Sequence, residues 1–163
     1  MDRIQWIEHK ICTRETAVHR CNALRTTSKR IVFTNGCFDI LHRGHLEQLA
    51  SAADLGDVLV VGVNTDASVQ GLKGPGRPVN REQDRAFQLA ALLCVDIVCL
   101  FDEDTPAQLI EAIRPDVLVK GGDYTADQVA GADFVLRHGG RVEIIPFVPG
   151  YSTSSLITRI REL

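Results

Sequence analysis

Short, continuous apolar runs alternate along the chain with segments whose apolar residues recur at helical spacing. Five of these runs predict strands, at residues 31–34, 57–63, 96–100, 116–119 and 142–146. The second run is rich in valine and unbroken by charge, which is typical of a strand covered on both faces. Strands of this kind, separated by helices, predict an α/β domain with a mainly parallel sheet.

Parallel strands need crossover connections, and right-handed crossovers place helices on both faces of the sheet. We therefore expect a Rossmann-like, doubly wound, five-stranded parallel sheet with helices on both faces. In such a sheet, ligands bind beyond the carboxyl ends of the strands, where the strand order reverses. The loops that follow the strands are thus the segments in which to look for chemistry.

The chain has the length of one domain, because 163 residues allow a single good core and not two. With 45% apolar and 24% charged residues, its composition is that of a globular protein. Residues 1–29 are mixed and polar, and they predict an N-terminal helical extension made of one helix and a linker. Residues 30–163 are expected to form the main domain.

Two further helices carry local signals. Asn80, with Gln83 three residues later, resembles a capping box, which predicts Asn80 as the N-cap of a helix. The last helix is expected over residues 153–162, with Leu156, Ile157 and Ile160 facing inward.

Charge and cysteine usage exclude several classes of protein. The net charge of −3 is spread without a long run of one sign, which argues against a nucleic-acid partner. The five cysteines form no C-x-x-C pair, so reduced thiols are favoured over a disulfide or zinc framework. No apolar run approaches the ~18 residues of a membrane span, and the start lacks a signal-peptide pattern. We expect a cytoplasmic protein without a membrane partner.

The loop after the first predicted strand carries the strongest candidate residues, His42 and His45. They straddle the start of a helix, where free amides and the helix dipole favour an anion. Two imidazoles at this spacing can point the same way and donate hydrogen bonds to a phosphate in a transition state. Gly36 and Gly44 would let the backbone approach that phosphate closely. The alternatives are chance capping histidines, or a zinc site with Cys37, whose spacing is irregular for zinc.

A glycine- and proline-rich segment, residues 71–80, follows the second strand. Lys73 lies between glycines, which suits a cation that closes over phosphates, and Arg77 could grip a second phosphate. The alternative is a solvated connecting loop.

Two more segments follow the later strands. Paired glycines in residues 120–124 permit close approach of a base or phosphate, although a plain glycine turn would look the same. We expect this loop to lie opposite His42, because the strands at 31–34 and 116–119 are plausible neighbours. Residues 150–155 bring a cluster of hydroxyls to a helix start, which suits either ordinary capping or a cradle for terminal phosphates.

The stretch from Phe33 to His45 resembles the signature of the cytidylyltransferase-like nucleotidyltransferases, whose hallmark is H-x-G-H. Ser152, Thr153 and Ser154 resemble the Ser-Thr-Thr element of that family. The resemblance implies that both histidines stabilise the α-phosphate during in-line attack, without a covalent enzyme intermediate. The expected catalytic residues are His42, His45 and Lys73. The expected nucleotide-binding residues are Thr34, Asn35, Gly36, Cys37, Phe38, Gly44, Lys120, Gly121, Asp123, Tyr124, Ser152, Thr153 and Ser154.

Six motifs in order resemble one subgroup, the adenylyltransferases that make ADP-heptose for lipopolysaccharide from ATP and heptose 1-phosphate. They are F-T-N-G-C-F-D-I-L-H-R-G-H, V-N-T-D-A-S-V, L-K-G, R-P-V-N, F-D-E-D-T-P and V-K-G-G-D-Y. In many bacteria this domain follows a sugar kinase, so the chain as given suggests a stand-alone form. The runner-up is a cytidylyltransferase acting on glycerol 3-phosphate or another phospho-alcohol.

The resemblance also implies Mg²⁺ as cofactor, held mainly by the phosphates, with Asp39 as the nearest protein ligand or, equally, a helix cap. The expected sugar-phosphate-binding residues are Asn64, Asp66, Arg77, Asp84 and Arg85, although Asp84 and Arg85 would also suit a solvated helix face. An apolar edge on the sheet or first helix would support a homodimer, as in similar enzymes.

A protein that binds a nucleotide as a sensor, without catalysis, is an alternative function from a different class. A dinucleotide-binding oxidoreductase is disfavoured, because no G-x-G-x-x-G follows the first strand.

Overall fold

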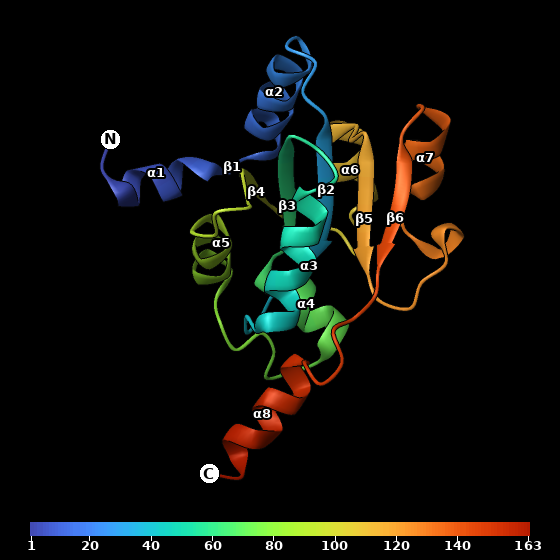
Figure 1. The fold of residues 1–163 in the computed structure, drawn as a ribbon. Helices are drawn as coiled ribbons and strands as arrows, with labels where there is room; N and C mark the ends of the chain where they lie inside the picture. Colours follow the sequence, from blue (N-terminus) through green and yellow to red (C-terminus); the bar gives the residue numbers. More distant parts are fainter.

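The computed structural model describes residues 1–163 and shows an α/β domain built on one parallel sheet (Figure 1). The sheet has six strands in the order β1-β4-β3-β2-β5-β6, and every neighbouring pair is parallel. The strands are β1 (Ile11–Cys12), β2 (Ile31–Gly36), β3 (Val58–Asn64), β4 (Ile97–Phe101), β5 (Val117–Gly121) and β6 (Arg141–Ile145). The predicted Rossmann-like class and its five strands are confirmed, and β1 is an addition.

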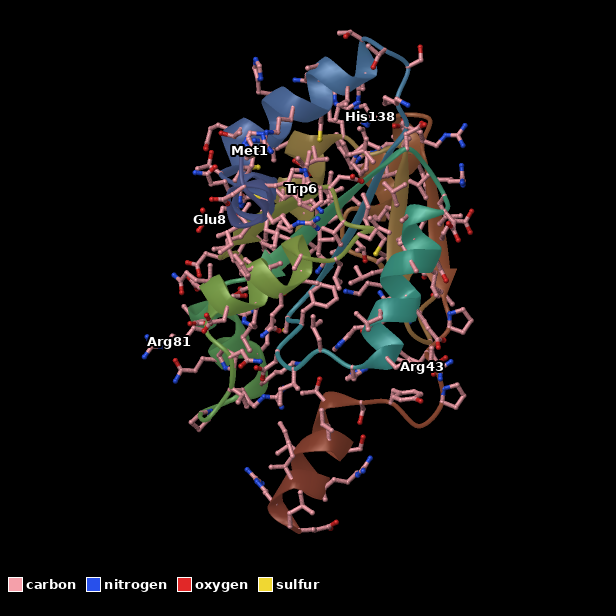
Figure 2. The ribbon with its side chains drawn as sticks, turned by 60° about the vertical axis from the view of Figure 1, so that its left-hand side comes forward. Met1, Trp6, Glu8, Arg43, Arg81 and His138 are labelled. Carbon is pink, nitrogen blue, oxygen red and sulfur yellow. The ribbon has the colours of Figure 1, made fainter.

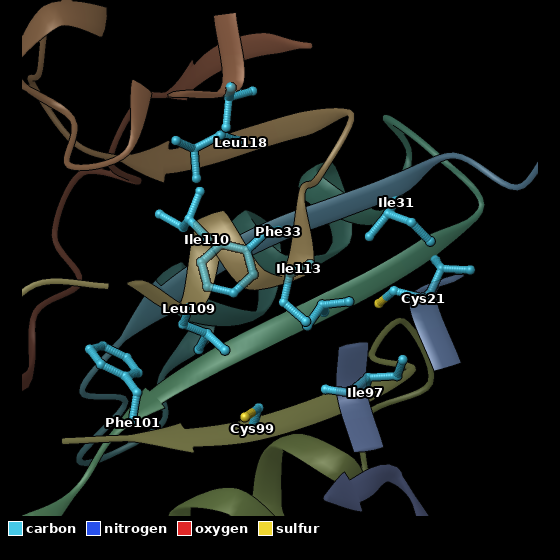
Figure 3. Packing of buried hydrophobic residues seen from close by; sticks show 14 of the residues in the cluster. Cys21, Ile31, Phe33, Ile97, Cys99, Phe101, Leu109, Ile110, Ile113 and Leu118 are labelled. Carbon is cyan, nitrogen blue, oxygen red and sulfur yellow. The ribbon is translucent and has the colours of Figure 1, made fainter. Parts of the chain in front are cut away.

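Helices cover both faces of the sheet, as expected. The helices are α1 (Arg3–Lys10), α2 (Arg14–Arg25), α3 (Arg43–Ala53), α4 (Asp66–Lys73), α5 (Glu82–Ala90), α6 (Ala107–Ile113), α7 (Ala132–Arg137) and α8 (Thr153–Arg161), with a 3-10 turn, η1 (Ala126–Gln128). Side chains of α2, α6 and α7 pack with Phe33 of β2 in one buried cluster (Figure 3). Side chains of α3 and α5 pack with Val32 in a second cluster on the opposite face. Successive strand residues thus feed different clusters, because side chains alternate across a strand.

The N-terminal segment differs from the single helix and linker that were expected. It contains α1, β1 and α2, and β1 pairs with β4 through Ile11 opposite Val98. Ala17 and Cys21 of α2 are fully buried in the cluster that also holds Phe33. A two-residue strand is too short to be recognised from its sequence pattern. The boundary near residue 30 stays a prediction, although α2 shares a core with the rest of the sheet.

Two local expectations about helices are wrong. Asn80 does not cap α5: the N-cap is Arg81, which makes no capping hydrogen bond through its side chain. The apolar residues of α8 do not form a buried face: Leu156 and Ile157 are only half-buried, and Ile160 is 56% exposed. Figures 1 and 2 show α8 extending away from the sheet beyond the start of α3, near Arg43.

The strand order reverses at β2, which lies between β3 and β5. The expected pairing of the strands at 31–34 and 116–119 is therefore confirmed. It brings the loop before α3 and the loop after β5 to the same edge of the sheet. No helix is both long enough and apolar enough to cross a membrane.

We predict that a chain beginning at residue 30 is less stable than the full chain. Removal of α2 exposes the core that Ala17 and Cys21 cover, and the lost burial should be worth roughly 3 kcal/mol or more. For a domain of this size that corresponds to a fall of about 6–12 °C in melting temperature. Thermal unfolding of both chains measures this difference in melting temperature. The full chain with Ile4→Ser, at an exposed position, is a control whose melting temperature should equal that of the unaltered chain. Equal melting temperatures would show that residues 1–29 are a dispensable extension.

Candidate active site

A cavity of about 760 Å³ opens at the carboxyl ends of the strands. Its walls come from the segments that follow β2 to β6, together with α3, the end of α4 and the start of α8. The predicted site residues that line it are Asn35, Gly36, Cys37, Phe38, Asp39, His42, Gly44, His45, Asn64, Lys73, Lys120, Gly121, Tyr124, Ser152, Thr153 and Ser154. The four sequence segments singled out for chemistry therefore meet in one place.

His42 is the N-cap of α3. Its Nδ1 accepts a hydrogen bond from the backbone N–H of His45 at 3.4 Å, so a neutral His42 carries its proton on Nε2. Burial lowers the pKa of His42 below its usual value. His42 can therefore cap the helix and bind a phosphate at the same time. The cap orients the ring, and the Nε2–H of the neutral ring is free to donate a hydrogen bond.

His45 lies directly against His42. The two rings stack at 3.8 Å between centroids, and the edge of Phe38 meets His45 at 5.3 Å. Burial, the adjacent His42 and the ammonium of Lys73 lower the pKa of His45 to about 4. Its Nδ1 is buried and has no hydrogen-bond partner in the protein. His45 is therefore uncharged at neutral pH and keeps hydrogen-bonding capacity for a ligand.

Two glycines beside this pair leave little room for a larger side chain. A Cβ on Gly44 would lie 3.1 Å from Cβ of Tyr151 and 3.2 Å from the His42 ring. A Cβ on Gly36 would lie 3.0 Å from the ring of Phe38. Phe38 itself has a φ of 47°, a left-handed backbone that is unfavourable for a bulky residue. Its ring is almost fully buried, and this packing holds the loop that leads into α3.

Lys73 reaches the cavity from a more ordered position than expected. It is the last residue of α4, and Gly74 ends that helix with a φ of 85°. The segment expected as a mobile loop from residue 71 is therefore helical up to Lys73. Lys73 and His45 line the same cavity, and the ammonium of Lys73 contributes to the lowered pKa of His45.

The loops after β5 and β6 form a wall of flat and small residues. The Nζ atom of Lys120 lies 5.8 Å from the centroid of the Tyr124 ring, and burial lowers the pKa of Lys120. Gly122 has a φ of 124°, and a Cβ there would lie 2.8 Å from the ring of Phe147. Phe147 lines the cavity but was not among the predicted residues. This wall has the shape and chemistry to hold a planar base.

Ser152, Thr153 and Ser154 line the cavity where α8 begins. Ser152 is the N-cap: its hydroxyl oxygen accepts from the backbone N–H of Ser155 at 3.1 Å. The ordinary capping role is thus present. The next two residues leave their amides and hydroxyls at the helix start, where an anion is favoured.

Asp39 lines the cavity and also has structural partners within the protein. Its buried carboxylate accepts from Nε of Arg77 at 2.6 Å and from the backbone N–H groups of Val79 and Asn80 at 2.7 and 3.0 Å. Burial raises its pKa, but the hydrogen bonds and the cation outweigh burial and lower it overall. These three contacts make Asp39 a structural anchor, and its role as a metal ligand stays a prediction. Arg77 is committed to the same pair and is absent from the cavity wall.

Arg85 and Asp66 are likewise structural. The fully buried guanidinium of Arg85 donates to the carbonyl of Cys37 at 2.6 Å, to the carbonyl of Asn80 at 3.0 Å and to Asp66 Oδ1 at 2.8 Å. Neither residue lines the cavity, so the expected contact with a sugar phosphate is not supported. Together these bonds fasten the loop after β2 to α4 and α5.

Three further predicted residues also lie outside the cavity wall. Thr34 is fully buried, with its hydroxyl unpaired, whereas Asp84 and Asp123 are exposed. Cavity residues that sequence reasoning missed include Gln48, Asp104, Thr105, Phe147 and Tyr151. Asp104 and Thr105 could have been found, because they directly follow a predicted strand and lie within a motif already noted. Gln48 could not, because a single glutamine inside a helix carries no signal.

Comparison with known proteins places this site in a family. The family model described as Cytidylyltransferase-like matches residues 33–159, which include all the cavity segments above. The chain belongs to the cytidylyltransferase-like family. The match begins at Phe33, within β2, and ends within α8, so the shared unit is the sheet from β2 onwards with its covering helices.

Similar members of the family are much longer proteins. The chain is 52% identical to the bifunctional protein HldE of Trichlorobacter lovleyi, over 95% of this chain and 32% of that protein. It is 54% identical to the one from Syntrophotalea carbinolica and 56% identical to the one from Methylobacillus flagellatus, over 94% and 93% of this chain and 31% of each relative. The chain thus spans about a third of the length of these relatives.

Solved structures agree with the cytidylyltransferase-like fold. The lipopolysaccharide core biosynthesis protein from Thermoplasma volcanium matches with a TM-score of 0.58 and 28% identity, over 74% of this chain and 97% of that one. Pantoate-beta-alanine ligase from Francisella tularensis matches with a TM-score of 0.57 and 14% identity, over 94% of this chain and 78% of that one. At that identity, the second match speaks for the fold alone.

We predict that His45 titrates near pH 4, well below the usual 6.5. Because the unfolded chain takes up this proton near pH 6.5 and the folded chain does not, the free energy of unfolding should fall as pH drops from about 6.5 to 4. NMR titration of the ring protons measures the pKa, and urea unfolding measures the pH dependence. His45→Gln should make that dependence shallower. A His45 pKa near 6.5 would contradict the neutral buried pair.

We predict that Asp39→Ala destabilises the protein by roughly 3 kcal/mol, because it strands Arg77 and two backbone donors in a buried place. Urea unfolding measures the change, and Asp123→Ala, at an exposed residue outside the cavity wall, is the matched control. Wild-type stability combined with a weaker response to Mg²⁺ would instead restore Asp39 as a metal ligand.

Proposed function

We propose that the protein is an adenylyltransferase that converts ATP and heptose 1-phosphate into ADP-heptose and pyrophosphate. The observation that carries this proposal is the stacked, neutral pair of His42 and His45 beside Lys73, in a cavity large enough for both substrates. High identity to the HldE proteins supports it over most of the chain. The solved relative described as a lipopolysaccharide core biosynthesis protein also agrees with a sugar-nucleotide product.

The reaction is a direct displacement at the α-phosphorus. A phosphate oxygen of the sugar phosphate forms the new P–O bond, and the bond to the oxygen that bridges the α- and β-phosphates breaks, so that oxygen leaves with pyrophosphate. The Nε2–H of His42 and the ring of His45 hydrogen-bond the α-phosphate oxygens as charge shifts between them. A neutral imidazole suits this task, because its N–H can donate to a phosphate oxygen without a charge having to be buried in the site.

Lys73 and the start of α8 serve the leaving group. Lys73 places a positive charge beside the histidines, and the amides and hydroxyls of Thr153 and Ser154 favour the terminal phosphates. The protein contributes positioning and charge neutralisation, which supply most of the catalysis in phosphoryl-type transfers. No side chain needs to act as a nucleophile.

Mg²⁺ would enter with the nucleotide and neutralise charge on its phosphates. No group of three or more histidine, cysteine, aspartate or glutamate side chains is arranged to hold a metal. Mg²⁺ keeps several waters and binds substrate phosphates through few protein ligands, so the open cavity suits it. The protein's own residues therefore hold the triphosphate, and the triphosphate holds the ion.

The site is expected to act in the cytoplasm, and its active form is expected to be a homodimer. Exposed apolar side chains outside the cavity wall, among them Ile160 of α8 at 56%, agree with a contact between copies. Both statements remain predictions. A nucleic-acid partner is not expected for a chain of this charge.

We predict that the purified protein releases pyrophosphate from ATP when heptose 1-phosphate is present. A coupled pyrophosphate assay checks this, with CTP and glycerol 3-phosphate offered in parallel as the alternative pair. Turnover of the alternative pair without turnover of ATP and heptose 1-phosphate would show a cytidylyltransferase. Binding of ATP without turnover of any phosphate acceptor would indicate a nucleotide sensor.

We predict that His42→Ala and His45→Ala each lower kcat by two orders of magnitude or more, while ATP still binds. The lost contacts act mainly in the transition state, so kcat and kcat/KM should fall together. His138→Ala, in an exposed ring outside the cavity, is the matched control. Steady-state kinetics with an ATP-binding titration makes the distinction, and an unaffected kcat would remove the catalytic role.

A further inference from the structure

The sheet order sets the cavity-lining loops in a row. Along the sequence β4-β3-β2-β5-β6, the loops after β4 and β6 lie on opposite sides of the loop after β2. His42 and His45 follow β2, so the α-phosphorus would lie near the middle of the row. The aromatic wall with Tyr124 and Phe147 belongs to the side of β5 and β6. If the base occupies that wall, the second substrate is left with the side of β3 and β4.

The loop after β4 presents three consecutive acidic residues, and two of them have structural partners. Asp102 accepts a hydrogen bond from the hydroxyl of Thr65, and Glu103 forms an ion pair with Arg14. These contacts anchor the loop to the start of α4 and to α2. They leave Asp104 as the member of the run that lines the cavity.

Asp104 is exposed and makes no ion pair or side-chain hydrogen bond within the protein. Thr105 follows it on the same cavity wall, and its hydroxyl is also free. A carboxylate is an unsuitable neighbour for phosphate oxygens, because the like charges repel. It is a good acceptor for sugar hydroxyls, since its two oxygens can take several hydrogen bonds at once. The chemistry of this wall therefore differs from that of the phosphate-binding centre.

We propose that Asp104 and Thr105 bind the hydroxyl groups of the sugar and so determine the specificity for the second substrate. This inference rests on the proposed adenylyltransferase function and adds the location of the sugar. The carboxylate of Asp104 accepts from two sugar hydroxyls, and the hydroxyl of Thr105 completes the contact. Two of the five residues first expected to bind the sugar phosphate, Asp66 and Arg85, are engaged with each other instead.

The test measures each KM separately for the full chain and its variants. Asp104→Asn should raise the KM for heptose 1-phosphate roughly tenfold or more, because a hydrogen bond to a charged acceptor is lost. Thr105→Val should raise it by a smaller factor. The KM for ATP and the Mg²⁺ concentration for half-maximal rate should stay within about twofold of wild type. Asp133→Asn, at an exposed residue of α7 outside the cavity wall, should leave every constant unchanged.

Several outcomes would overturn this proposal. An unchanged KM for heptose 1-phosphate in Asp104→Asn would remove the sugar contact. A raised Mg²⁺ requirement with an unchanged KM for the sugar would make Asp104 a metal ligand. A raised KM for ATP alone would place the nucleotide on this wall.

A binding titration separates failure of this inference from failure of the proposed function. Calorimetry with heptose 1-phosphate and an ATP analogue whose α,β-bridging oxygen is replaced by a methylene group needs no turnover. A wild-type enzyme that releases no pyrophosphate refutes the proposed reaction. Weaker binding of heptose 1-phosphate to Asp104→Asn than to wild type would then still support the sugar contact. Equal binding to both proteins, or no binding to wild type, would refute it.

Discussion

The buried carboxylate of Asp39 is the constraint on which the active-site cavity depends. It lies just after β2 and holds Arg77 and two backbone N–H groups of the segment that leads from α4 to α5. These bonds join that segment to the loop that carries His42. Lys73 ends α4 only a few residues earlier, so the same anchor restrains the lysine relative to the histidines. The ion pair of Asp39 and Arg77 thus helps to position the groups that face the cavity.

The electrostatics of the cavity follow from this packing. Burial lowers the pKa of both His42 and His45, and the adjacent His42 and the ammonium of Lys73 lower that of His45 further. Neutral donors thus occupy the centre of the site, with cationic side chains around them. The arrangement separates two tasks: hydrogen bonding to the reacting phosphate and neutralisation of the triphosphate. Asp104 adds a third environment at the far side, where no phosphate is expected.

Much of the site could be predicted from the sequence, because its residues follow strands that were themselves recognisable. Parallel strands end at one edge, so the segments around His42, Lys73, Lys120 and Ser152 had to converge. The errors concern polar residues beside those segments. Arg85 lies in a sequence pattern that suits a solvated helix face as well as a ligand site, yet it is fully buried. Whether a charged side chain is buried depends on hydrogen-bond partners elsewhere in the chain, and the local sequence pattern does not predict those partners.

The sequence by itself determined the α/β class, the five long strands and the pair of histidines at a helix start. These features depend on local periodicity and on the type of residue that follows each strand. Only the tertiary structure decided that Asp39 is an anchor, that β1 extends the sheet and that α8 has no fully buried residue. The physical reason is that each of these outcomes depends on which distant atoms compete for the same hydrogen bond or the same buried surface.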